Sequence, residues 1–278
     1  MTPENAAPDG VRRIEEGVRT DLSDALTYGR YLDLDRLLSA QHPQSSPEHH
    51  DELLFIVQHQ TTELWFKLVL HELRAAREHL DNDHVEPALK CLARVKSIQR
   101  TLTERWSVLA TLTPREYAQF RDSLASSSGF QSYQYRAVEF ILGNKNRSML
   151  AVFESEPAAH TLLTDVLEQP TLYDAFLRML ARQGYPIPAE VVGRDVTVPW
   201  TPQPALVPVF RDIYESDSTP WHVYEACEDL VDLEDNFQAW RFRHLRVVQR
   251  TIGMKTGTGG PSGGDACQAR PSPKPPPS

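Results

Sequence analysis

Two histidines, His59 and His244, lie in segments whose other side chains are mostly apolar. His59 follows Phe55 by four residues, so both would project from one face of a helix. His244 continues an apolar stripe and is flanked by three arginines. A histidine in such a stripe is usually a hydrogen-bonded core residue. Two of them on different helices could instead face the two sides of a planar cofactor, and both interpretations stay open here.

A second group of side chains could bind a carboxylate. Tyr117 and Arg121 are four residues apart and would share a helix face, and the planar guanidinium of arginine matches a carboxylate in bidentate fashion. Ser128 and Gly129 follow closely in the chain. An exposed salt bridge is the ordinary alternative for such an arginine. Thr258, between two glycines, could close over a ligand or lie in a flexible hinge.

Long helices are needed to position these residues. No glycine occurs between Gly29 and Gly129, and apolar side chains from Cys91 to Leu109 recur at steps of three and four. The pattern predicts helices over residues 51–80, 87–110, 130–142, 170–182, 204–216 and 221–252. The predicted fold class is therefore all-α, a helical bundle.

The boundaries of these elements carry further signals. Ser46 is the predicted cap of the first long helix, with Pro47 at its first position. Residues 191–200 are β-branched and bounded by prolines, which is typical of a loop or a short strand. After Thr256 the sequence becomes Gly-rich and then Pro-rich. We expect a polar N-terminal segment at 1–20, one all-helical domain at 21–262 and a disordered Gly/Pro-rich tail at 263–278.

Composition restricts the class of protein. The 278-residue chain is 40% hydrophobic and 24% charged, with a mean hydropathy of -0.44, which is typical of a soluble globular protein. Its net charge of -9 argues against sequence-independent binding of nucleic acid, which needs a positive surface. No apolar run approaches the roughly 20 residues that span a bilayer, and no secretory signal pattern is present. We expect a cytoplasmic protein without a nucleic-acid or membrane partner.

Several common kinds of chemistry are disfavoured. Three cysteines without a CxxC pair argue against a disulfide framework and a four-cysteine zinc site, and Cys91 and Cys227 are interpreted as buried core residues. The absence of Glu-x-x-His argues against a di-iron bundle. The glycine run at 257–264 fits neither a dinucleotide-binding nor a phosphate-binding loop, and no Gly-x-Ser-x-Gly elbow occurs.

Several longer motifs carry a family resemblance. They lie in collinear order over roughly Leu22 to Gly260, and together they are far more specific than any single histidine. The motifs are Tyr28–Asp35, His50–Gln60, Glu63–Leu68, Ser128–Ser132, Leu142–Asn146, Trp240–His244 and Arg250–Gly260. In these stretches the chain resembles the tryptophan 2,3-dioxygenase family. The resemblance implies an all-helical homotetramer that binds haem b, ferrous in the active form. It also implies that dioxygen opens the indole ring of L-tryptophan, giving N-formylkynurenine.

The resemblance also implies roles for residues at the haem. His244 matches the proximal iron ligand, and His59 matches the distal histidine that hydrogen-bonds the indole N–H. Phe55 and Trp106 match walls of the indole or haem pocket. Gly129 matches a backbone position near the bound dioxygen.

Further matches concern the polar end of the substrate and the oligomer. Arg121 and Tyr117 match residues at the substrate carboxylate, with Ser128 beside them, and Thr258 matches a contact to the carboxylate and ammonium groups. The resemblance implies that a neighbouring subunit contributes residues to the pocket, so that the oligomer would be part of the site. These residues are Tyr28, Tyr31 and Leu32.

The sequence departs from the family pattern after Gly260. Residues 261–265 and a proline-rich tail replace a further family segment, so closure over the substrate would differ. A related haem monooxygenase that gives an oxindole from tryptophan or a methylated tryptophan is the enzymatic alternative. A haem-binding or interaction protein without catalysis is the alternative from another class.

Overall fold

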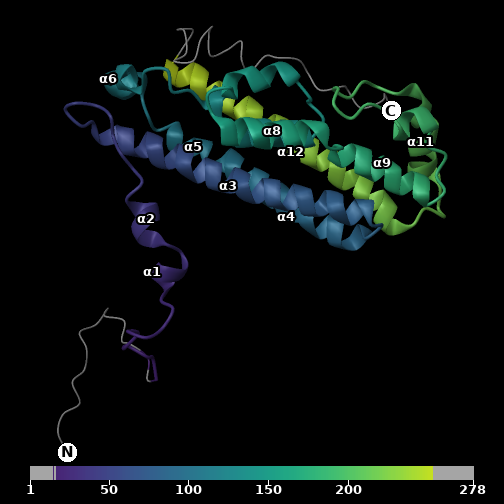
Figure 1. Ribbon diagram of the computed structural model, residues 1–278, viewed down its shortest axis with the longest axis horizontal. Coiled ribbons are helices and arrows are strands. Elements are labelled where there is room, and N and C mark those ends of the chain that lie inside the picture. The colour runs from purple at the N-terminus through teal and green to yellow at the C-terminus, as the bar shows by residue number, and fades with distance from the viewer. Residues whose placement is uncertain (1–14, 16, 253–278) are drawn as a thin grey trace, which may run out of the picture. The chain divides into compact units, whose positions relative to one another are not determined.

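The computed structural model describes residue 15 and residues 17–252 (Figure 1). The chain divides into two compact units, one ending at His42 and the other beginning at Pro43. The described part is helical and contains no strand, so the predicted all-α fold is confirmed. The expected tail at 263–278 and Thr258 lie outside the described residues.

The first unit carries two short helices, α1 (Tyr28–Tyr31) and α2 (Leu34–Leu38). Thr27 caps α1, because its hydroxyl oxygen accepts the N–H of Arg30 at 3.3 Å. Neither helix has a buried residue. Tyr28 is 75% exposed and Tyr31 73% exposed, so their aromatic surface is not used to build a core within this chain.

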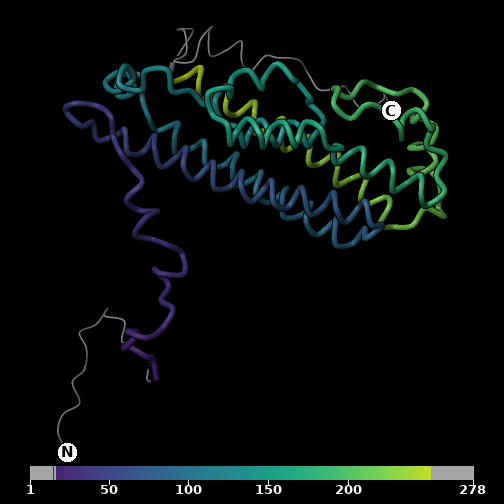
Figure 2. The backbone as a smooth tube through the Cα atoms, in the orientation of Figure 1, coloured from purple at the N-terminus to yellow at the C-terminus, as the bar shows by residue number. Residues whose placement is uncertain are grey.

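Three long helices make up most of the second unit: α3 (His50–Asp81), α4 (Val85–Glu104) and α12 (Trp221–Ile252). Figure 2 shows their backbones running alongside one another, and α4 packs against both α3 and α12. The bounds of α12 agree with the predicted helix over 221–252. The apolar stripe that predicted this helix therefore faces the core, as helical periodicity requires.

Shorter helices complete the second unit. Helices α7 and α9 pack against α3, α8 packs against α7, and α5 and α6 contact both α3 and α12. The α-helices are α5 (Trp106–Leu109), α6 (Pro114–Phe120), α7 (Tyr133–Ile141), α8 (Pro157–Glu168), α9 (Leu172–Arg182), α10 (Ala189–Val192) and α11 (Val207–Glu215). The 3-10 helices are η1 (Arg121–Leu124), η2 (Gly129–Gln131), η3 (Arg147–Phe153) and η4 (Pro204–Leu206).

The predicted start of the first long helix is wrong. Helix α3 begins at His50 with His49 as its N-cap, and the Ser46–Pro47 peptide bond in front of it is cis. The buried carboxylate of Glu52 accepts the backbone N–H groups of the two residues before Ser46, at 2.7 and 3.0 Å. These hydrogen bonds hold the preceding loop against the first turn, so the helix starts later than its proline suggests.

One further expectation is corrected, and one that was left open is decided for the loop. The predicted helix over 87–110 is interrupted at Arg105, which ends α4 and precedes α5. Residues 191–200 contain no strand, but the end of α10 and a loop. Arg194 in this loop donates to a buried carboxylate on α9, and that contact holds the loop in place of strand pairing.

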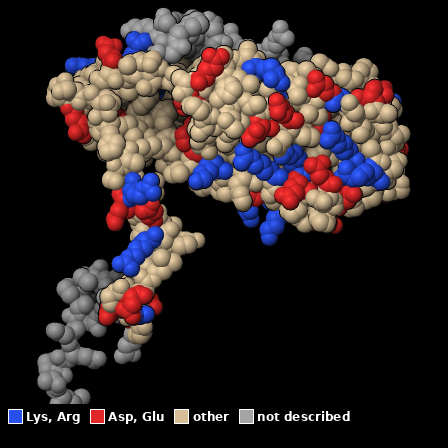
Figure 3. Space-filling model, in the orientation of Figure 1, with Lys and Arg blue, Asp and Glu red and all other residues tan. Residues whose placement is uncertain are grey.

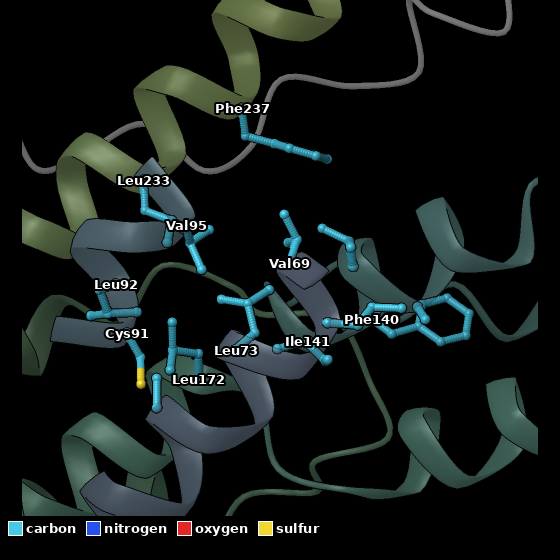
Figure 4. Close-up of a cluster of buried hydrophobic side chains, with 14 of the residues drawn as sticks. Val69, Leu73, Cys91, Leu92, Val95, Phe140, Ile141, Leu172, Leu233 and Phe237 are labelled. Carbon is cyan, nitrogen blue, oxygen red and sulfur yellow. The ribbon is translucent and has the colours of Figure 1, made fainter. Parts of the chain in front are cut away.

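The core lies between the long helices. Figure 4 shows Val69 and Leu73 from α3, Val95 from α4 and Phe237 from α12 converging with residues of α7 and α9. Cys91 and Cys227 are buried and free, which confirms their interpretation as core residues. Acidic and basic side chains are interspersed on the face shown in Figure 3. Within the described residues, no helix is both long and apolar enough to cross a membrane.

A buried polar cluster joins α8, α9 and the loop after α10. We call it the Asp174 cluster, and it comprises Lys145, Thr171, Asp174, Arg194 and Trp200. Arg194 donates to both carboxylate oxygens of Asp174, at 2.6 and 2.9 Å, and lies over the Trp200 ring at 4.4 Å. Thr171 donates its N–H and its hydroxyl to the same carboxylate, at 2.8 and 2.7 Å. The hydroxyl oxygen accepts the indole N–H of Trp200 at 3.3 Å.

Lys145 closes the other side of this cluster. Lys145 is only 2% exposed. Its ammonium group donates to the carbonyls of Val166, Leu167 and Gln169 at 2.7–2.9 Å. These are unpaired carbonyls at the C-terminal end of α8, so the lysine acts as its cap. Burial lowers the pKa of Lys145 to about 8. The Leu142–Asn146 motif therefore serves helix packing in this structure.

Candidate functional site

His59 packs against an aromatic group from α3 and α6 through Phe55. The Phe55 and His59 ring centroids lie 4.2 Å apart on one face of α3, which the spacing of four residues predicted. From α6, Tyr117 lies 5.9 Å and Phe120 5.7 Å from the Phe55 ring. Tyr117 and Phe120 are buried, whereas Phe55 and His59 are half-buried. The histidine therefore has an apolar wall on one side and remains accessible on another.

One hydrogen bond defines the proton position on His59. Its Nδ1 lies 2.7 Å from the carbonyl oxygen of Phe55. A carbonyl can only accept, so Nδ1 carries the proton in this contact, and in the neutral ring Nε2 is an acceptor. Burial is the main cause that lowers the pKa of His59, and the charge of Arg105 adds to it. His59 is therefore a neutral imidazole that offers an acceptor.

His244 on α12 stacks on two buried tryptophans. Its ring centroid lies 4.7 Å from Trp106 at an interplanar angle of 20°, and 5.8 Å from Trp240 at 22°. Burial lowers the pKa of His244 to about 4, and the nearby His59 and Arg241 add smaller contributions in the same direction. His244 is therefore neutral at pH 7, which is the form of an imidazole that can ligate a metal.

The structure brings the two histidines together. They come from different long helices, α3 and α12, and they lie near enough that a proton on His59 would lower the pKa of His244. The indole N–H groups of Trp106 and Trp240, on the His244 side, are buried without a hydrogen-bond partner among the described residues. Buried donors of this kind are uncommon in native proteins and often accompany function.

Tyr117 and Arg121 also come together. Thr113 and Glu116 form a capping box at the start of α6, with Glu116 Oε2 accepting the Thr113 N–H at 2.8 Å. The helix ends at Phe120, so Arg121 begins the next 3-10 turn while keeping helical dihedral angles. Burial raises the pKa of Tyr117, and this effect is larger than the opposing effect of Arg121. Arg121 opposes it through its charge and through a hydrogen bond with the Tyr117 hydroxyl.

Other predicted residues lie on other elements of the structure. The hydroxyl oxygen of Ser128 accepts the Phe130 N–H at 3.3 Å, a local bond at the start of η2, and Gly129 is exposed. Tyr28, Tyr31 and Leu32 belong to the first unit.

Sequence analysis missed two residues. Trp240 was named only as the first residue of the Trp240–His244 motif, although it stacks on His244 and carries an unmatched N–H. Arg105 was not singled out at all, although its guanidinium reaches the turn of α3 that carries His59. An arginine directly before Trp106, inside an apolar repeat, was the available signal for it.

The described members of this group form what we call the two-histidine site. It comprises Phe55, His59, Trp106, Tyr117, Arg121, Trp240 and His244. A single neutral imidazole with aromatic surroundings suits the iron of a planar macrocycle, which brings its own equatorial ligands. An acceptor at His59 and a guanidinium at Arg121 suit a ligand with one polar ring N–H and one carboxylate.

Comparison with known proteins decides the family. The family model for tryptophan 2,3-dioxygenase matches residues 13–183 and 205–267, well over half of the chain. The chain belongs to the tryptophan 2,3-dioxygenase family. A tryptophan 2,3-dioxygenase of Saccharopolyspora erythraea is 64% identical over 91% of this chain and 90% of its own length. A tryptophan 2,3-dioxygenase of Kineococcus radiotolerans is 64% identical over 92% of this chain and 90% of its own length. One from Xanthomonas campestris is 58% identical over 91% of this chain and 85% of its own length.

Proposed function

We propose that this chain is a haem-dependent oxidoreductase that uses dioxygen to cleave the indole ring of L-tryptophan, giving N-formylkynurenine. The observation that carries the proposal is the pairing of two neutral imidazoles from α3 and α12, one offering a metal ligand and the other a hydrogen-bond acceptor. Membership of the tryptophan 2,3-dioxygenase family supports the same reaction.

The residues around His244 fit haem b. A neutral imidazole is the form that ligates iron, and the tryptophans that stack on it supply an apolar wall and two unmatched N–H donors. Haem, when bound in its ferrous form, supplies the redox metal that dioxygen needs to react with a closed-shell organic molecule. We assign His244 as the proximal ligand and Trp106 as part of the haem pocket.

The other residues bind and orient the amino acid. Arg121 holds the substrate carboxylate with Tyr117 and Ser128 beside it, and Thr258 contacts the carboxylate and ammonium groups. Good positioning is worth several kcal/mol of the barrier, about 7 kcal/mol or more in the best cases. Gly129 provides backbone near the dioxygen.

The indole ring is held by Phe55 and selected by His59. Nε2 of His59 accepts the ring N–H, because Nδ1 is committed to the carbonyl of Phe55. This hydrogen bond fixes the orientation of the ring and rejects ligands without the N–H. His59 is not required as a base, because electrophilic attack on an indole does not need prior loss of that proton.

The assembly is proposed to be a cytoplasmic homotetramer in which residues 21–262 act as one catalytic domain. The family matches over residues 13–183 and 205–267 support this extent. The exposed Tyr28 and Tyr31, with Leu32, would enter the pocket of a neighbouring subunit. Burial of that aromatic surface gives the oligomer a hydrophobic driving force.

An absorption titration tests the function. Ferrous, haem-loaded protein is titrated with L-tryptophan without oxygen, air is admitted, and the product is analysed by mass spectrometry. We expect a spectral shift on binding and a product that has gained two oxygen atoms. A gain of one oxygen atom would instead indicate a monooxygenase, and binding of haem without any turnover would contradict the enzymatic role.

A further inference from the structure

Arg105 joins the two sides of the two-histidine site. It occupies the single position between α4 and α5, so that its main chain interrupts the helix directly before Trp106. Trp106 stacks on His244, while the Arg105 side chain extends to α3. One dipeptide thus contacts the His244 ring through one residue and the helix of His59 through the other.

The guanidinium of Arg105 contacts three acceptors on one turn of α3. Its Nη2 donates to the carbonyl of Gln58 at 2.8 Å, to the hydroxyl of Thr61, and weakly to that of Thr62 at 3.4 Å. This turn contains His59. The geometry therefore ties the backbone next to His59 to the residue next to Trp106.

The hydroxyl groups on this turn are oriented to receive the guanidinium. Thr61 donates its proton to the carbonyl of Val57 at 2.7 Å, and Thr62 donates to that of Gln58 at 2.7 Å. With the protons so directed, the hydroxyl lone pairs are available to Arg105. Threonine hydroxyls that bond back to the helix tend to bend it, and the Arg105 guanidinium contacts α3 at this turn.

A purely structural tie would not need a permanent charge beside the histidine. Arg105 is half-buried, its Nη1 has no hydrogen-bond partner among the described residues, and burial lowers its pKa. The same charge lowers the pKa of His59 and so favours the neutral ring. The hydrogen bonds of Arg105 to this turn and its charge near the ring both act on the acceptor at Nε2 of His59.

We propose that Arg105 is a positioning residue that fixes the turn of α3 carrying His59, and thereby the direction of the acceptor that recognises the indole N–H. This inference rests on the proposed function, in which His59 selects that N–H. Arg105 acts through His59 and does not itself contact the substrate.

The test compares two ligands on haem-loaded protein without oxygen. Dissociation constants are measured from the absorption change for L-tryptophan and for an analogue whose ring N–H is replaced by sulfur. Wild-type protein is expected to prefer tryptophan about tenfold, the value of one hydrogen bond. Arg105→Met should reduce this ratio to about two, and Arg105→Lys, which keeps the charge without the fork, should give an intermediate ratio.

Controls separate positioning from stability. Arg77→Met removes another arginine that donates from α3 to a backbone carbonyl, that of Pro170 at 3.0 Å, but it lies 18 residues from His59. The ratio should be unchanged in this variant. In a His59→Ala background, Arg105→Lys should not alter the ratio further, because the acceptor is already absent.

Each outcome bears on one proposal. If the wild type binds both ligands equally, the role of His59 in the proposed function fails. If it discriminates but Arg105→Met and Arg105→Lys weaken both ligands by the same factor, Arg105 has only a structural role and our inference is overturned. If Arg105→Met does not fold, the lysine variant alone decides, since an unchanged ratio there would contradict the positioning role.

Discussion

The Asp174 cluster and the two-histidine site both place polar side chains inside an apolar bundle, but they match donors to acceptors differently. In the Asp174 cluster, one carboxylate accepts from Arg194 and Thr171, and Thr171 also accepts from Trp200. In the two-histidine site, two indole N–H groups are buried without a partner among the described residues. The satisfied Asp174 cluster favours a unique fold. The two unmatched N–H groups lower the stability of the two-histidine site, but they remain able to bind a ligand.

The largest expected effect concerns cofactor binding. His244→Ala should abolish stable uptake of haem, measured as loss of the Soret band after reconstitution, because the variant lacks the imidazole that we assign as the iron ligand. Because the ring stacks on two buried tryptophans, the free energy of unfolding of the haem-free protein should also fall, by about 1–3 kcal/mol, and circular dichroism should show that the variant remains folded. A full Soret band in this variant would remove the assignment of His244 and weaken the contrast between the two regions.

The next effect concerns stability. Asp174→Asn should lower the free energy of unfolding by about 3–5 kcal/mol, measured by urea denaturation. The substitution leaves Arg194 buried without its charged partner. Asp83→Asn is the matched control, since Asp83 also pairs with an arginine but is exposed, and asparagine tolerates its left-handed dihedral angles. The control should cost less than about 1 kcal/mol. Equal losses in the two variants would contradict the structural role of the cluster.

The Asp174 effect should depend on pH. Burial would raise the pKa of Asp174, but the hydrogen bonds from Arg194 and Thr171 prevail and lower it. The unfolded chain then binds a proton at higher pH than the folded one, so the stabilisation is complete above the ordinary value of 3.8. It should be lost as the pH falls further, through the lowered pKa. The difference in stability between wild type and Asp174→Asn should shrink below pH of about 4, measured by urea unfolding at several pH values.

A smaller effect concerns substrate affinity. Arg121→Leu should raise KM for L-tryptophan about 30-fold, about 2 kcal/mol, and lower kcat through misplacement of the ring. Arg115→Leu on α6, the helix that leads into Arg121, is the control, because Arg115 is exposed, and its kinetics should match those of the wild type. Unchanged KM in Arg121→Leu would exclude the carboxylate role.

The smallest effect is expected at the distal histidine. His59→Ala should retain some activity and lose about tenfold in preference for tryptophan over the sulfur analogue, because one neutral hydrogen bond is removed. His71→Ala changes an exposed histidine on the same helix and should leave the preference intact. Complete loss of turnover in His59→Ala would indicate an obligatory catalytic role instead.

The sequence predicted the helices whose apolar repeats are long. The stripe over 221–252 and the spacing of Phe55 and His59 both appear in the structure as expected. Helix α8 was not predicted. The helical repeats were nevertheless sufficient to infer the fold class, and the longer motifs were sufficient to infer the family.

What the sequence did not predict depends on contacts between distant residues. Arg105 reaches Gln58, 47 positions away, and Arg194 reaches Asp174, 20 positions away. The start of α3 was misplaced because Glu52 holds the preceding loop. None of these partners can be chosen from local propensity, since many carboxylates and carbonyls in the chain would accept an arginine equally well.

Gly143 lies in a tight turn that contacts Trp200 of the Asp174 cluster. Its φ of +108° disfavours any side chain, and an added Cβ would lie 3.4 Å from Cδ1 of Trp200. Gly143 also accepts the backbone N–H of Trp200 at 3.4 Å, so backbone strain at this turn would reach the indole over which Arg194 lies. A substitution here would therefore reduce the yield of folded protein without altering the chemistry of the molecules that do fold. Low activity in a crude extract of such a variant would reflect how much enzyme survives, and only activity normalised to bound haem would reveal that each surviving molecule still works.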